Sequence, residues 1–329
     1  MFKRLTPIYL LMIAVSVFAA NVFAQTGTPL PPGSGMSDEK PGSILFFPVY
    51  KSDITRPQAE NTRINITNTH QMQNAYIHMF FVDTADCAPA DMFVCLTGNQ
   101  TFTFFISDFD PGVTGYLMVV AVNKDTGIPL QHNFLIGDYY LKQVSGHSAN
   151  LNAVSFAALK DIPAVMNNDG STLDLKFDDI NYNAGPRIVA LDGVPSRLDG
   201  NDTSLILTRL GGDLAGGATQ NLGGLIGLVY DDTEKSFSFT ASGGNCQYRN
   251  TLSDSFPRLV SRFSGVIRSG HQGWIKLWAV ANIPMIGVMI NFHPNTGNST
   301  SAYSGGHNLH VLTTTTTGVF KIPVFYPSC

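Results

Sequence analysis

The chain has 329 residues, a formal net charge of −4 and only 13% charged residues. No basic field of the kind that attracts nucleic acid is present, so we expect no nucleic-acid partner. Gly, Asn, Thr and Ser are plentiful, and aromatic and β-branched residues recur in short clusters. This usage is typical of an all-β extracellular protein.

The amino terminus predicts a signal peptide over residues 1–24. Lys3 and Arg4 precede the apolar run 8–20, and Val22-Phe23-Ala24 supplies a cleavage site with small residues. Residues 25–42 are rich in Pro, Gly and Ser and predict a flexible leader. We therefore expect a secreted, periplasmic or cell-surface protein with no membrane span after cleavage.

From residue 43 onward, short segments with strand periodicity alternate with turn sequences such as Asp110-Pro111-Gly112. The strand pattern lapses near 148–160, where Leu151, Val154 and Ala158 follow a helical spacing and predict one short helix. A polar cluster at 167–170 marks the expected domain boundary. We predict two β-sandwich domains, Ig-like or jelly-roll-like, over residues 43–170 and 171–329.

The stretch 271–293 is the longest nearly apolar run after the amino terminus. Ile275 and Leu277 fall on one strand face, and Trp274, Lys276 and Trp278 fall on the other. We expect a β-hairpin or a tightly linked strand pair at the centre of a sheet. A membrane helix is disfavoured, because a lysine and a proline interrupt a span that is already short. The Trp/Lys/Trp face predicts a contact surface for a protein or a glycan.

Four cysteines, Cys87, Cys95, Cys246 and Cys329, follow the predicted cleavage site. An even number in an oxidising compartment favours two disulfides, for which three pairings exist. We expect Cys87 to pair with Cys95 across a short polar loop, and Cys246 to pair with Cys329.

No metal site and no cofactor are expected. His307 and His310 are three positions apart, and in one strand such residues face opposite sides unless the segment turns. Strand-end carboxylates such as Asp231 and Asp232 offer oxygen ligands for calcium, but no EF-hand pattern accompanies them, and this alternative stays open.

Several segments, NTRINITNT, HMFFVD, DPGVTGYLMVVAV, HNFLIGDYY, GHSANLNAVSFAAL and GHNLH, resemble parts of uncharacterised exported bacterial proteins rich in β structure. The resemblance implies an exported, β-rich, bacterial protein and no particular activity.

No catalytic residues are predicted, because the nearest approach to a nucleophile elbow, residues 146–150, lacks the second glycine. The sequence thus favours a non-enzymatic binding or structural module. The alternative is a secreted carbohydrate-active enzyme or its carbohydrate-binding domain, suggested by the tryptophan face and the strand-end carboxylates.

Overall fold

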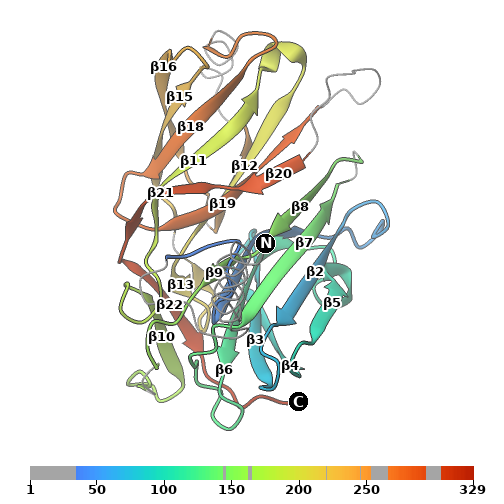
Figure 1. Ribbon diagram of the computed structural model, residues 1–329, viewed down its shortest axis with the longest axis vertical. Coiled ribbons are helices and arrows are strands. Elements are labelled where there is room, and N and C mark those ends of the chain that lie inside the picture. The colour runs from blue at the N-terminus through green and yellow to red at the C-terminus, as the bar shows by residue number, and fades with distance from the viewer. Residues whose placement is uncertain are drawn as a thin grey trace, which may run out of the picture.

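The computed structural model describes residues 35–143, 146–161, 165–219, 221–244, 246–252, 266–293 and 305–329. These residues form an all-β protein of five sheets, which confirms the predicted fold class (Figure 1). The predicted signal peptide lies outside the described residues. Among the residues described, no helix is long and apolar enough to cross a membrane.

The first half of the chain forms a β-sandwich. Its five-stranded sheet has the order β4-β3-β6-β1-β9, and its four-stranded sheet has the order β5-β2-β7-β8. The strands of the first sheet are β1 (Ile44–Lys51), β3 (Ala75–Asp83), β4 (Pro89–Leu96), β6 (Thr114–Val122) and β9 (Val154–Phe156). Those of the second are β2 (Asn61–Asn68), β5 (Thr101–Phe105), β7 (Leu135–Lys142) and β8 (Ser148–Asn152), with the short helix α2 (Ile106–Phe109) after β5.

A second sandwich is built from residues of the second half. Its five-stranded sheet has the order β16-β15-β18-β11-β21, and its four-stranded sheet has the order β17-β12-β19-β20. The first contains β11 (Gly185–Pro195), β15 (Gly224–Tyr230), β16 (Ser236–Ser242), β18 (Gln272–Ala279) and β21 (His310–Thr315). The second contains β12 (Asp202–Arg209), β17 (Gln247–Thr251), β19 (Met285–Phe292) and β20 (Gly305–Asn308), and the 3₁₀ helix η1 (Arg197–Asp199) precedes β12.

The fifth sheet adds a third layer to the first sandwich. It has the order β10-β22-β13-β14 and contains β10 (Thr172–Phe177), β22 (Gly318–Pro323), β13 (Gly212–Asp213) and β14 (Ala218–Thr219). Leu175 and Phe320 of this sheet share one core cluster with Phe46 of β1. Leu45 and Phe47, on the other face of β1, belong to the cluster inside the first sandwich. The run ILFFPV is therefore apolar on both faces because β1 lies in the middle layer.

The two sandwiches share buried surface. Ile206 of β12 and Val288 and Ile290 of β19 belong to the same core cluster as the first sandwich. Residues on both sides of position 170 thus contribute to one cluster, and the division into two domains near that position remains a prediction.

The helix expected near 148–160 is wrong. Residues 148–152 and 154–156 form β8 and β9, and the α-helix of the described residues lies at 106–109 instead. In β8, Ala149 and Leu151 are buried while Asn150 and Asn152 are exposed. Burial therefore alternates with the period of two that is typical of a strand. The strand pairs with β7.

The expected hairpin of 271–293 is also wrong, although each of its strands is an inner strand. β18 is the third strand of its five-stranded sheet, and β19 lies in the opposite sheet between β12 and β20. The chain therefore crosses between sheets after Ala279. β19 has apolar residues on both faces: Met289 faces the second core cluster, and Val288 faces the first. A strand with two apolar faces must be covered on both sides. β19 meets this need because one of its faces packs inside the second sandwich and the other packs against the first.

The expected disulfide pairing is wrong as well. Cys87 is bonded to Cys246 with a Cα–Cα distance of 5.5 Å, and Cys95 is bonded to Cys329 with a distance of 6.1 Å. The segment taken as a loop between Cys87 and Cys95 is the extended strand β4. At ~3.3 Å per residue, the six steps from Pro89 to Cys95 within β4 alone span roughly 20 Å. That is far beyond the ~7 Å that a disulfide bridges.

The last residues of the expected flexible leader are bound to the sheet. Ser37 forms a β-bridge with Ser155, and the Ser155 hydroxyl donates to the Lys40 carbonyl oxygen at 2.5 Å. Gly42 pairs with Leu135. Residues 35–42 therefore follow β9 instead of forming a free tether.

Candidate contact face and histidine cluster

The outer face of the sheet β16-β15-β18-β11-β21 carries the predicted contact residues. In β18, Ile275 and Leu277 are fully buried, Lys276 and Trp278 are half-buried, and Trp274 is 36% exposed. The strand alternation predicted from the sequence is therefore present in the structure. The use of this face for contact remains a proposal.

Neighbouring strands extend this face sideways, because residues directly opposed in an antiparallel sheet point to the same side. One row across the sheet is Ser238, Leu228, Lys276, Ala190 and His310. The next row is Thr240, Ile226, Trp278, Ile188 and Thr313, and a shorter row is Ser236, Tyr230 and Trp274. Aromatic and aliphatic side chains thus occupy the middle strands, and Ser, Thr and His occupy the two edges.

Local contacts hold the aromatic rings in place. Trp274 stacks on Tyr230 with ring centroids 4.2 Å apart and planes at 7°. Lys276 Nζ lies 6.0 Å from the centroid of the Trp278 ring, a cation–π distance. Because the rings are already ordered, a partner would lose little side-chain entropy on contacting them.

One edge of this sheet is the strand β21. Five of its six residues are exposed, including Val311 at 38% and Leu312 at 48%. The strand pairs with β11 on one side, and the sheet order places it at the end of the sheet.

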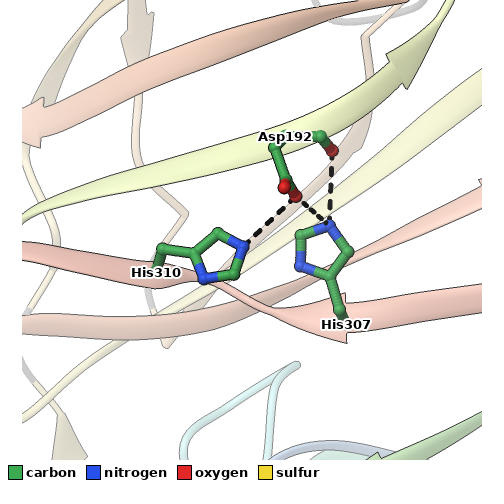
Figure 2. A group of neighbouring side chains, drawn as sticks. All are labelled: Asp192, His307 and His310. Carbon is green, nitrogen blue, oxygen red and sulfur yellow. Dashed lines mark hydrogen bonds and ion pairs between the residues drawn. The ribbon is translucent and has the colours of Figure 1, made fainter.

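Asp192, His307 and His310 converge at this edge (Figure 2). His307 Nε2 lies 3.0 Å from Asp192 Oδ1, and His310 Nε2 lies 3.2 Å from the same oxygen. The sequence allowed this convergence only if the segment turns between the two histidines. They belong to two strands, β20 and β21, because the chain passes from one sheet to the other at the buried Leu309. The turn that the sequence left open therefore occurs between them.

The position of Asp192 depends on a bulge in β11. The register between β11 and β18 shifts between Leu191 and Val194, so Asp192 is the first residue past the regular ladder. Bulges re-aim side chains at the edges of sheets. Here the bulge brings both the carboxylate and the carbonyl oxygen of Asp192 to His307, whose Nε2 is 3.3 Å from that carbonyl oxygen.

Both ring nitrogens of His307 face oxygen atoms that accept hydrogen bonds. Its Nδ1 lies 2.8 Å from the Asn308 carbonyl oxygen, which can only accept, so this hydrogen bond forms when Nδ1 carries the hydrogen. In the neutral ring with that hydrogen, the lone pair is on Nε2, the atom that faces Asp192.

The strand-end carboxylates are engaged in contacts with neighbouring protein groups. Asp110 accepts a hydrogen bond of 2.5 Å from the Tyr50 hydroxyl, and burial raises the pKa of this carboxyl. Asp231 accepts from the Thr233 and Lys235 backbone amides. Asp232 contacts Nδ1 of His271 in an exposed pair. Of these groups, Asp231 stabilises its own turn, whereas Asp110 and Asp232 contact residues from other segments.

Comparison with known proteins gives no family: no family model matches the chain, and no curated protein matches it. A solved structure described as "Crystal Structure of Thermotoga maritima 1070" is 15% identical and aligns with a TM-score of 0.27. The match covers 35% of this chain and 92% of that chain. A TM-score this low does not establish a shared fold.

Proposed function

We propose that this chain is an exported, non-enzymatic binding module whose contact surface is the outer face of the sheet β16-β15-β18-β11-β21. The observation that carries the proposal is the partly exposed strip of Tyr230, Trp274 and Trp278 on the middle strands of this sheet. Export, from a bacterial cell, rests on the signal-peptide pattern and the resemblance described above, and the two disulfides suit an oxidising compartment.

The composition of this face supports a contact role. Interfaces between proteins have an apolar centre rich in Trp and Tyr and a polar rim. Here the centre holds Tyr230, Trp274 and Trp278, while hydroxyl side chains from β16 form one rim and β21 forms the other. Lys276 lies in the centre with its ammonium group over a ring, so its charge is held beside the apolar surface.

A protein partner fits this face better than a glycan. A sugar ring binds best on an open aromatic face, whereas Trp274 and Tyr230 cover one face of each other by stacking. The aliphatic Ile226, Leu228 and Ile188 fill the positions beside the aromatic rings, and such side chains contact apolar protein surface.

The test is a binding measurement that depends on this face. The purified protein is followed by sedimentation over a range of concentrations, for self-association, and is used as bait for the exported proteins of its own host. Trp274→Ala and Leu228→Lys are compared with Met72→Ala, which removes an 88% exposed apolar side chain on the first sandwich.

We expect a saturable partner, either a second copy or a distinct exported protein, that is lost with both face variants and kept with the control. A monomer that captures no face-dependent protein contradicts the proposal. Recognition on a glycan array that requires Trp274 would favour the carbohydrate-binding alternative instead.

A further inference from the structure

We propose that Asp192, His307 and His310 form a binding site for a divalent transition-metal ion of the zinc class. The inference does not rest on the proposed function, although His310 also lies in the outermost row of the contact face.

The spacing of the three ligand atoms suits such an ion. A tetrahedral zinc site with bonds of 2.0–2.1 Å has neighbouring ligand atoms about 3.3 Å apart. Here the two histidine Nε2 atoms lie 3.0 and 3.2 Å from Asp192 Oδ1, and all three atoms lie within 4.8 Å of one another. The two distances to Asp192 Oδ1 thus lie within about 0.3 Å of the tetrahedral spacing.

The hydrogen bond behind His307 prepares it as a ligand. Histidines that bind metals usually donate their other ring hydrogen to a carbonyl or a carboxylate, which fixes the tautomer. His307 does this through Nδ1 to the Asn308 carbonyl. Nε2, which lies 3.0 Å from Asp192 Oδ1, is then the atom through which a neutral His307 ring would bind an ion shared with the carboxylate.

The donor set selects the class of ion. Two imidazole nitrogens and one carboxylate suit Zn²⁺ and its transition-metal neighbours, whereas Ca²⁺ and Mg²⁺ prefer oxygen ligands throughout. Three protein ligands leave a coordination position open for water or for an external group. The site faces solvent, since the side chains of His307 and His310 are 34% and 56% exposed and that of Asp192 is 67% exposed.

An ordinary ion pair gives a useful contrast. His271 and Asp232 also form an exposed histidine–carboxylate contact. That contact is one-to-one, whereas at Asp192 two imidazoles share a single carboxylate oxygen. The site also joins β20 to β11 and β21, so an ion there would cross-link both sheets of the second sandwich.

The test is a titration of the purified protein, without a polyhistidine tag, with Zn²⁺ by calorimetry and with Co²⁺ by visible absorption, against Ca²⁺ and Mg²⁺. The variants are His307→Ala, His310→Ala and Asp192→Asn, with His271→Ala as the matched control. Circular dichroism checks that each variant is folded. Because His310 is exposed, its replacement should disturb the fold least.

We expect one saturable Zn²⁺ or Co²⁺ site per chain. We expect no saturable site for Ca²⁺ or Mg²⁺ over the same range of ion concentrations. Each triad variant should weaken binding by at least about tenfold, since the loss of even an outer partner of a zinc ligand has that effect. His271→Ala should bind as the unchanged protein does. The absence of saturable Zn²⁺ binding, or binding that the folded His310→Ala variant retains in full, overturns the proposal.

Discussion

Cys87 and Cys246 are bonded across 159 residues of sequence, joining the turn between β3 and β4 to the residue before β17. The bond therefore fastens the first sandwich to the second, at a place where the chain offers no short connection. Cys95 and Cys329 fasten the carboxyl-terminal segment to β4 in the same way.

Removing the first bond should weaken the whole fold. In the chain-entropy model a closed loop of this length stabilises the folded state by up to about 5 kcal/mol, although measured values are often smaller. We expect Cys87→Ser/Cys246→Ser to lower the free energy of unfolding by several kcal/mol in a urea titration. Peptide mapping without reduction should recover Cys87 linked to Cys246, and a recovered Cys87–Cys95 peptide would contradict the structure.

The two faces of β18 should respond differently to truncation. Leu277 is fully buried, and Leu277→Ala should cost about 2–5 kcal/mol of unfolding free energy, as is usual in cores. Trp278 is half-buried on the opposite face, so Trp278→Ala should cost less than the ~3–5 kcal/mol of emptying a core aromatic site. Parallel denaturant titrations compare the two. Equal losses would place Trp278 in the core and remove it from the contact face.

Patterns within one strand were predictable from the sequence. The alternation in β18 and the apolar run of β1 both follow from which faces of the strand are buried against neighbouring layers. This burial appears directly in the spacing of the apolar residues. The segment 148–156 misled because Leu151 and Val154 fit a helical spacing as well as two short strands. Pairing with β7 and β1, which lie elsewhere in the chain, decided between them.

Features that depend on distant parts of the chain were not predictable. The partner of Cys87 is set by how the two sandwiches pack, and no local spacing encodes that. The meeting of His307 and His310 requires the chain to change sheets at Leu309, and it also requires the bulge that presents Asp192. Two histidines three positions apart, with Leu309 between them, give no sign of either event.

A close approach of backbone and side chain at Gly115 should make this position intolerant of a methyl group. An added Cβ would clash with the Val82 carbonyl oxygen and lie 2.5 Å from the Tyr50 hydroxyl. It would therefore displace Tyr50 from Asp110, to which the hydroxyl donates.

We expect Gly115→Ala to lower the free energy of unfolding by about 1–3 kcal/mol or more, the usual cost of overpacking. The matched control is Gly224→Ala, where the nearest atom is the exposed Val280 Cγ2 at 3.2 Å. Thermal and urea unfolding compare the two. A neutral Gly115→Ala would show that β6 and β1 are less tightly packed than the structure has them.

Stability should decline in mild acid because of His132. This side chain is 5% exposed, and its Nε2 lies 3.0 Å from the Asn68 Oδ1, to which it donates. Burial, helped by the nearby His70, lowers the pKa of His132 from 6.5 to about 4.

The sign of the effect follows from these pKa values. Above pH 6.5 the ring is neutral in both states, and its contribution is constant. Between pH 6.5 and 4 the unfolded chain binds the proton and the folded chain does not, so acid favours unfolding. From pH 7.5 to pH 5 the free energy of unfolding should fall by roughly 2 kcal/mol from this group.

His132→Gln should flatten this part of the pH profile. Glutamine can keep the donation to Asn68 but does not titrate, so the variant is less stable at pH 7.5 and loses less on acidification. Urea titrations at pH 7.5, 6.5, 5.5 and 5.0 measure both proteins, and His271→Gln, at an exposed position, is the control for replacing a histidine. If His132→Gln keeps the full slope between pH 6.5 and 5, another group is responsible, and the burial of a neutral His132 does not govern acid stability.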